Sequence, residues 1–258
     1  MAGPASPRAL GAGVILPATY RLHAFEQLSS TNEEAKRLAA EGEAEGAVVW
    51  ALHQTAGRGR QGRVWHSPVG GLYLSILVRP GADLYRAQQL SFVAGLALLD
   101  TAAAAMPGSA QHLSLKWPND ILLDAKKLAG ILLESAAGAV PWLIVGLGLN
   151  VEAAPEIEGR PAIALGAPAG PDNLERFIEF FVGFWDVGLQ DWRRNGFAEV
   201  RARWLRYAAD LGQPVTARLA ERTLTGIFKD LDEDGALILT EPTGATHRIV
   251  AGEVFGGP

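Results

Sequence analysis

The chain has 258 residues, 48% of them hydrophobic and 20% charged, enough to bury the core of one large domain or of one domain with a small appendage. A formal net charge of −5 argues against a general nucleic-acid binder, and the absence of Cys excludes disulfide frameworks, Cys-ligated zinc and thiol catalysis. No apolar run approaches the roughly 20 residues of a membrane span and no signal peptide is recognised, so we expect a cytoplasmic protein without a membrane partner.

The first part of the chain consists of a segment without hydrophobic periodicity, followed by residues that predict the start of a helix. Residues 1–19 are rich in Ala, Gly and Pro, which predicts a flexible N-terminal tail. Thr31 is followed three positions later by Glu34, and this spacing is that of a capping box. We therefore expect a helix that Thr31 caps and that ends near Gly42.

The middle of the chain alternates between apolar runs and turn residues. The runs predict strands at residues 47–53, 72–78, 113–117, 121–123, 128–133 and 142–149. Helices are expected at 84–105, where apolar residues cover most faces, and at 173–192, where they recur with the 3.6 period. Strands followed by helices without regular alternation indicate an α+β domain, which we place at residues 20–210.

The sequence changes in character at about residue 211. Four short β-rich segments follow, and the turn sequences DEDG and EPTG separate the later ones. These segments lie at residues 215–219, 224–228, 236–240 and 247–250. We expect a small β-barrel over residues 211–258.

Part of this segment matches the EF-hand calcium-binding pattern, through Asp230, Asp232, Asp234 and Glu241. An EF-hand needs flanking helices, whereas the preceding residues read as a strand and Pro242 blocks an exiting helix. We therefore interpret the acidic residues as a hairpin turn. The five His residues show no metal-ligand spacing, so we expect no metal ligands in the chain.

Residues 57–63 form the most informative motif, in which three Arg alternate with three Gly. Glycine lets backbone N–H groups approach an anion closely, and Arg offers a planar, permanently charged fork that suits phosphates and carboxylates. The motif predicts a mobile loop that closes over an anionic ligand. A solvated basic loop or a nucleic-acid patch is the alternative that the motif alone leaves open.

A second group of candidates follows in the sequence KWPND, residues 116–120, and at Lys127, which begins an apolar strand. A charged side chain at a strand end can bridge a carboxylate and a phosphate, although an edge-strand lysine that blunts aggregation has the same sequence pattern. Because strand neighbours point to opposite faces, only one of Lys126 and Lys127 can enter a site. Strict alternation places Lys127 on one face with Ala129, whose small side chain would leave space for a ligand.

The segment GLGLN closes the last predicted strand of the main domain. Its two glycines form half of a dinucleotide-binding fingerprint, but no third Gly follows and no helix is signalled, so a Rossmann site is weakly supported. We interpret Gly146 and Gly148 as making room for a ligand against the sheet, with Asn150 as a hydrogen-bonding group at the end of the strand.

In their order along the chain, the segments STN, QTAGRGRQGRVW, SPVGGLYLS, KWPND, KLAGIL and GLGLN resemble the catalytic domain of biotin–protein ligases. The β-rich segment after residue 210 resembles the SH3-like C-terminal domain of the same family, so the resemblance covers residues 20–258. It implies a class II synthetase-like α+β domain with a mixed sheet, followed by the SH3-like barrel. Only residues 1–19 precede the match, fewer than the roughly 50 of a domain, so we expect neither the DNA-binding domain of some members nor a nucleic-acid partner.

The resemblance also implies the reaction. Biotin would be activated with ATP to biotinyl-5′-AMP and pyrophosphate, with Mg²⁺ expected to accompany ATP. The biotin would then pass to a lysine of the biotin carboxyl carrier domain of a carboxylase. No nucleophilic side chain is needed, which agrees with the absence of Cys and of a GxSxG motif. Members of the family are often dimeric, so a homodimer is one of the two oligomeric states, monomer or dimer, that the resemblance leaves open.

Site residues are carried over from the matching motifs. Those that would contact biotin are Ser30, Thr31, Asn32, Gln54, Arg58, Gly59, Arg60 and Lys127. Those that would contact ATP or the adenylate are Gly57, Arg58, Arg60, Arg63, Trp65, Lys116, Asp120 and Asn150. The catalytic residues would be Lys127, Arg58 and Arg60, with the two arginines nearest the charged linkage of the ligand.

Two other functions remain alternatives. A lipoate or octanoate ligase or transferase of the same fold is one, and the GRGRQGR loop together with KWPND favours biotin over it. A non-catalytic biotin-binding sensor is the other, and the presence of Lys127 and of all three loop arginines favours an enzyme.

Overall fold

The computed structural model describes residues 9–80, 86–137, 141–156 and 161–256. A seven-stranded mixed sheet forms its centre, with the strand order β1-β2-β3-β7-β6-β5-β4. The pairing of β1 with β2 is parallel and the other pairings are antiparallel. In chain order the strands are β1 (Arg21–Leu28), β2 (Ala47–Gln54), β3 (Gly71–Val78), β4 (Leu113–Lys116), β5 (Asp120–Leu123), β6 (Lys126–Ala136) and β7 (Trp142–Asn150).

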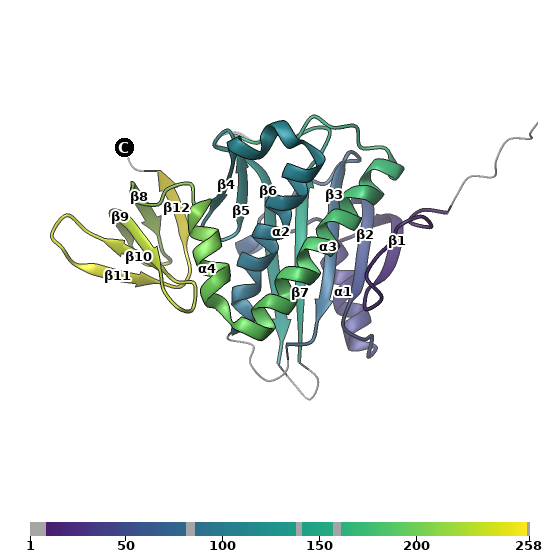
Figure 1. Cartoon of the computed structure of the whole chain (residues 1–258), viewed down its shortest axis with the longest axis horizontal. Helices are drawn as coiled ribbons and strands as arrows, with labels where there is room; N and C mark the ends of the chain where they lie inside the picture. Colours follow the sequence, from purple (N-terminus) through teal and green to yellow (C-terminus); the bar gives the residue numbers. More distant parts are fainter. Residues whose placement is uncertain (1–8, 81–85, 138–140, 157–160, 257–258) are drawn as a thin grey trace, which may run out of the picture.

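Helices cover both faces of this sheet (Figure 1). Helix α2 (Leu90–Ala105) and helix α3 (Pro171–Asn195) pack against each other over one face of the sheet, and α4 (Phe197–Arg206) contacts both. Helix α1 (Thr31–Ala40) packs on the opposite face, against β2, β3 and β7. Because strand neighbours point to opposite faces, Val48 and Trp50 join the α2 side of the core whereas Val49 joins the α1 side.

The C-terminal residues form a separate five-stranded antiparallel sheet, an SH3-like unit with the strand order β11-β10-β9-β8-β12. Its strands are β8 (Pro214–Arg218), β9 (Thr223–Leu231), β10 (Leu237–Thr240), β11 (Thr246–Ile249) and β12 (Glu253–Gly256). The unit lies beside α4 and the β4–β5 edge of the main sheet (Figure 1). Two contacts across the junction are the Trp117 indole N–H, which donates to the Gly235 carbonyl over 3.1 Å, and the Arg201–Asp230 ion pair at 2.5 Å.

The expected α+β class and the small C-terminal β unit are confirmed, whereas several local predictions differ. Strands β1 and β12 and helix α4 were not predicted. The helix expected at 84–105 begins at Leu90, after a 3₁₀ turn at Arg86–Gln89, and residues 84–85 lie outside the described part of the chain. The acidic segment is a hairpin turn, as expected: the Asp232 carboxylate accepts backbone N–H groups from Asp234 and Ala236 and pairs with Arg248.

Residues 9–19 pack against α3 rather than forming a loose tail. The backbone N–H groups of Gly11 and Ile15 donate to the carboxylates of Glu175 and Glu179, over 2.9 and 2.8 Å. The tail prediction does not hold for these residues, and the residues before them lie outside the described part. The domain limits proposed from the sequence remain predictions.

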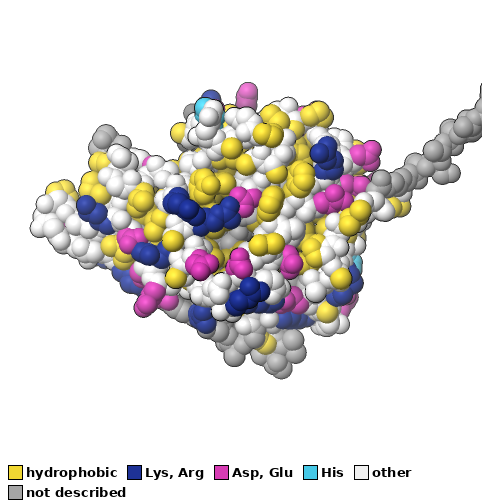
Figure 2. All heavy atoms as spheres, viewed as in Figure 1, with side chains coloured by type: hydrophobic (Ala, Val, Ile, Leu, Met, Phe, Trp, Pro, Cys, Tyr) yellow, Lys and Arg dark blue, Asp and Glu magenta, His cyan; other side chains and the backbone are white. Residues whose placement is uncertain are grey.

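The face that carries α2, α3 and α4 shows cationic, anionic and apolar side chains side by side rather than one continuous basic surface (Figure 2). Among the described residues, no helix combines the length and the apolar character needed to span a membrane.

Candidate active site

A pocket of about 580 Å³ opens on the α1 side of the sheet and extends to the C-terminal unit. It runs across the sheet from Gln54 on β2 to Lys116 on β4, and beyond them to Arg218 and Phe255 of β8 and β12. The loop of residues 57–63 lies over it. The pocket therefore brings together side chains from both units of the chain.

Hydrogen-bonded polar side chains form the end of the pocket next to α1. The backbone N–H of Thr31 donates to Gln54 Oε1 over 2.8 Å, and Ser75 Oγ donates to Asn32 Oδ1 over 2.6 Å. Asn32 Nδ2 donates to the Glu134 carboxylate over 2.7 Å, which fixes the orientation of the amide. Thr31, Asn32 and Ser75 are buried. Glu134 does not line the pocket and is paired with Lys36 over 2.6 Å, so the pocket itself meets neutral side chains at Thr31, Asn32 and Gln54, which suit a neutral polar ring.

Thr31 does not cap α1, so the predicted capping box is wrong. Ser30 occupies the N-cap position, and the Thr31 hydroxyl lies 3.2 Å from Gln54 Oε1 and 2.8 Å from Ser75 Oγ. Thr31 therefore does not serve both as a helix cap and as a site residue, because Gln54 accepts the first N–H of the helix.

The glycines of β7 make room for side chains of the site. A Cβ built on Gly146 would lie 2.0 Å from Asn32 Oδ1, and one on Gly148 would lie 2.3 Å from the Trp65 indole nitrogen. Both distances are far below van der Waals contact. The space that we assigned to a ligand is therefore occupied by Asn32 and Trp65, which lie directly on the sheet.

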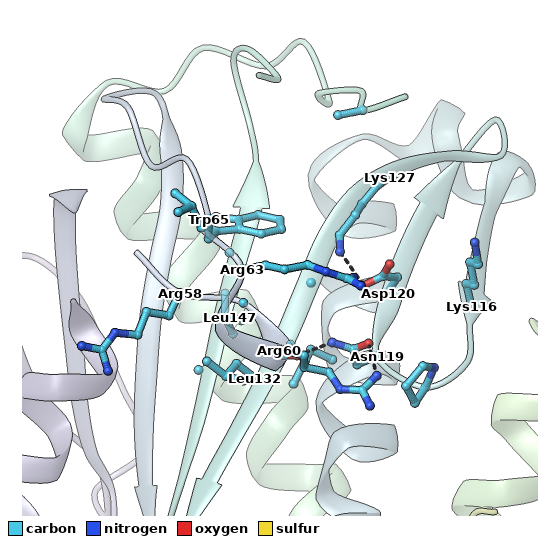
Figure 3. Close-up of a pocket in the computed structure, with 18 of the residues that line it drawn as sticks. Arg58, Arg60, Arg63, Trp65, Lys116, Asn119, Asp120, Lys127, Leu132 and Leu147 are labelled. Atoms are coloured by element: carbon cyan, nitrogen blue, oxygen red, sulfur yellow. Dashed lines mark hydrogen bonds and ion pairs between the residues drawn. The ribbon is translucent and has the colours of Figure 1, made fainter. Parts of the chain in front are cut away.

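Lys127 lies in the middle of the pocket. Its ammonium pairs with Asp120 Oδ1 over 2.6 Å and lies 5.3 Å from the centre of the Trp65 ring (Figure 3). Lys126 is exposed and does not line the pocket. Asp120 thus fixes the position of the one lysine of this pair that faces the pocket.

The small residue beside Lys127 is Gly130, and the expectation of Ala129 is wrong. The register between β5 and β6 shifts at this point, so that Lys127 and Ala129 pair with successive residues of β5 and Leu128 is extra. Such a bulge interrupts the alternation of faces. A Cβ on Gly130 would lie 3.3 Å from Lys127 Nζ, whereas Ala129 is buried in the core.

Arg58 is held by helix α1 and points away from Lys127 and Asp120 (Figure 3). Its guanidinium pairs with Glu33 over 2.8 Å, and Glu33 also pairs with Lys36 over 2.9 Å. The hydrogen bond from Lys36 lowers the pKa of Glu33, and the positive charges of Lys36 and Arg58 lower it further. Arg58 is therefore not the arginine nearest the centre of the pocket in this structure.

Arg60 and Arg63 face the junction with the C-terminal unit. Arg60 donates to Asn119 Oδ1 over 3.3 Å and to the Gly252 carbonyl over 3.4 Å, and its burial lowers the pKa of the guanidinium. Arg63 pairs with Glu253, and this hydrogen bond raises the pKa of Arg63. The loop is thus attached to strand β12 as well as to α1.

Two family models match this chain. One is the biotin/lipoate A/B protein ligase family, over residues 24–150, and the other is the biotin protein ligase C-terminal domain, over residues 210–257. The chain is also 41% identical to a biotin–[acetyl-CoA-carboxylase] ligase of Paracoccus denitrificans, over 88% of this chain and 97% of that protein. The chain belongs to the biotin protein ligase family.

Two further comparisons agree with this membership. A biotin–[acetyl-CoA-carboxylase] ligase of Mycobacterium tuberculosis is 35% identical, over 91% of this chain and 88% of that protein. The structure of a biotin protein ligase from Aquifex aeolicus in complex with biotin and ATP has a TM-score of 0.74 and 29% identity, and covers 91% of this chain and 97% of that one. The resemblance inferred from the sequence motifs is confirmed.

Nearly all the residues that the ligase resemblance singles out line this pocket; their individual roles remain predictions. Gly57 is the exception, since it lies at the base of the loop, where a Cβ would meet the Trp65 carbonyl at 2.5 Å. Asn150 is buried, and its amide donates to the Ile163 carbonyl over 3.1 Å. This hydrogen bond ties the end of β7 to the segment around Ile163, in addition to the contact with the adenylate that is predicted for Asn150.

Sequence reasoning missed several residues of the ligase site. Ser75 and Glu134 each interrupt an apolar strand, and that interruption is a signal we did not use. The C-terminal residues Arg218, Glu253 and Phe255 line the pocket without any local sequence signal, because the fold alone brings them there.

Binding of an anionic ligand is expected to protect the loop of residues 57–63 from proteolysis. The glycines raise the entropy of the open loop, and a bound anion gives its arginines a common partner that holds the loop closed. Limited trypsin digestion with and without biotin and ATP, followed by mass spectrometry of the fragments, measures cleavage at Arg58, Arg60 and Arg63. Equal cleavage rates in both samples would contradict the prediction, and cleavage at the exposed Arg222 of the β8–β9 turn is the internal control.

Proposed function

We propose that this protein activates biotin with ATP to form biotinyl-5′-AMP and pyrophosphate, and then transfers the biotin to a lysine of a biotin carboxyl carrier domain. The observation that carries the proposal is the order of groups along the pocket. A neutral hydrogen-bonding end at Thr31, Asn32 and Gln54 leads to Lys127 at the centre, and cationic side chains follow on the far side. This order matches a ligand with a neutral ring, a carboxylate and then phosphates.

In the first step, an oxygen of the biotin carboxylate attacks the α-phosphorus of ATP. The bond from that phosphorus to the bridging oxygen breaks, and its electron pair leaves with pyrophosphate. Lys127, positioned by Asp120, stabilises the negative charge that develops on the α-phosphate. Arg60, whose burial strengthens its electrostatic action, lies across the same part of the pocket.

In the second step, the amine of the acceptor lysine attacks the carbonyl carbon of the mixed anhydride, and AMP leaves. Positioning and electrostatic stabilisation are sufficient for both steps, so no protein nucleophile takes part. The arginine loop covers the intermediate and excludes water, which would otherwise hydrolyse the adenylate.

Mg²⁺ would accompany ATP in the first step. In the described part of the chain, no three His, Asp or Glu side chains cluster as a metal site. Mg²⁺ in nucleotide sites needs one or two carboxylates besides the phosphates, and the pocket supplies Asp120 for this purpose. The donor set therefore fits a metal that arrives with the nucleotide, and the charge it supplies would offset that of the phosphates.

The test is mass spectrometry of a biotin carboxyl carrier domain after incubation with the protein, ATP, Mg²⁺ and biotin. We expect a mass gain of one biotin on a single lysine, and none when ATP is left out. A gain with lipoate or octanoate in place of biotin would support the alternative ligase. Tight binding of biotin without any mass gain would support the sensor. A cytoplasmic location, a homodimer and the absence of a nucleic-acid partner remain predictions.

A further inference from the structure

Two cationic side chains at the far end of the pocket lie against one aromatic ring. Lys116 Nζ of β4 lies 5.6 Å from the centre of the Phe255 ring, and the Arg218 guanidinium carbon of β8 lies 5.0 Å from the same centre. Both cations line the pocket, and Phe255 is 38% exposed. The ring thus holds two like charges from different units of the chain at one edge of the pocket.

These two cations differ from most of the other cations of the pocket, and Arg60 also donates only to an amide and a backbone carbonyl, those of Asn119 and Gly252. Lys127, Arg58 and Arg63 each have a carboxylate partner, at Asp120, Glu33 and Glu253. By contrast, within the four described ranges no carboxylate lies within ion-pair distance of Lys116 or Arg218. Their positive charge is therefore available to an anionic ligand at this end of the pocket.

The geometry of the proposed first step determines which anion reaches this end. Displacement at phosphorus places the attacking and leaving oxygens on opposite sides of the phosphorus atom. The biotin carboxylate would approach from the side of Gln54 and Thr31, on β2 and α1, toward Lys127 on β6. The leaving pyrophosphate must then extend toward β5 and β4, where Lys116 and the C-terminal unit lie.

We propose that Arg218 of the C-terminal unit, together with Lys116, binds the pyrophosphate end of ATP and stabilises the charge that it gains on leaving. This inference rests on the proposed function. It assigns the C-terminal unit a direct contact with one substrate: β8 carries Arg218, and β12 pairs with β8 and carries the ring that supports both cations.

The test measures the two half-reactions separately in the full-length protein. Arg218→Ala is expected to raise both the KM for ATP and the KM for pyrophosphate about tenfold in biotin-dependent ATP–pyrophosphate exchange. Biotin affinity is expected to stay unchanged, because the biotin end of the pocket lies across the sheet. Transfer of biotin from prepared biotinyl-5′-AMP to the acceptor is also expected to stay unchanged, because pyrophosphate takes no part in it.

Two further variants complete the design. Arg218→Lys keeps the charge and is expected to recover most of the ATP affinity. Arg222→Ala removes an equal charge from an exposed site of the same unit outside the pocket and is expected to behave like the parent. Unchanged ATP and pyrophosphate constants in Arg218→Ala, or a loss confined to the transfer step, would overturn the inference. A parent protein without biotin-dependent exchange would instead refute the proposed function.

Discussion

Lys127→Ala is expected to slow biotin-dependent formation of the adenylate about a hundredfold, which corresponds to about 3 kcal/mol of lost transition-state stabilisation. The Lys127 ammonium lies in the middle of the pocket, positioned by Asp120 at 2.6 Å and facing the Trp65 ring. No other lysine within the described ranges reaches this place: Lys126 is exposed, and Lys116 lies at the far end, against Phe255. Pyrophosphate release at saturating ATP and biotin measures the effect.

Lys126→Ala is the matched control for this prediction. It removes the same charge from the neighbouring residue, whose side chain lies outside the pocket, and is expected to turn over like the parent. Thermal melts of both variants should remain close to that of the parent, since Lys127 is half-buried and its ion pair with Asp120 is partly solvated. If Lys127→Ala released pyrophosphate at the parental rate, or if Lys126→Ala were the inactive variant, the assignment of Lys127 would be wrong.

Gly146→Ala is expected to weaken biotin binding by more than tenfold and to lower Tm by several degrees. The new Cβ would lie 2.0 Å from Asn32 Oδ1, and Asn32 has little freedom to withdraw because Ser75 and Glu134 hold its amide on both sides. Overpacking of a close-packed site costs about 1–3 kcal/mol, and a broken buried hydrogen bond costs about as much again. Isothermal titration with biotin and a thermal melt measure the two effects.

Gly183→Ala is the control, because a Cβ on this residue of α3 meets nothing within 4 Å. It is expected to leave biotin affinity unchanged and to raise stability slightly, since Ala is favoured over Gly in a helix by up to about 1 kcal/mol. The double variant Gly146→Ala/Asn32→Ala removes the clash but also the hydrogen bonds of Asn32, so it should recover only part of the lost Tm and none of the affinity. Parental biotin affinity in Gly146→Ala would show that Asn32 does not need its present position.

Local sequence patterns predicted most strands of the main sheet. The central strands β2, β3 and β7 are buried on both faces, so they read as continuous apolar runs that are hard to miss. Strand β1 lies at the edge of the sheet and mixes polar with apolar residues, so it carries no such run. Strand β12 (Glu253–Gly256) was also not predicted.

The chemistry of the site was readable where its residues are neighbours in the chain. Residue type and spacing indicated anion binding at the glycine–arginine loop, at KWPND and at the lysine that follows. The order of these motifs along the chain was enough to indicate the family. Alternation along a strand indicated that only one of Lys126 and Lys127 could enter the site, the family resemblance pointed to Lys127, and the structure places Lys127 in the pocket. The same alternation failed one residue later, because a bulge depends on the pairing of β6 with β5.

Contacts between distant parts of the chain were decided by tertiary structure. Ser75 reaches Asn32 across 43 residues, and the loop residue Arg60 reaches Gly252 across 192. No periodicity or spacing rule encodes such contacts, because they depend on how α1, the sheet and the C-terminal unit pack together. Residue types and their order were enough to indicate the family to which this chain belongs. The packing of its two units decided which side chains meet in the pocket. Most of the lining residues come from the main domain, and packing alone adds Arg218, Glu253, Val254 and Phe255 of the C-terminal unit.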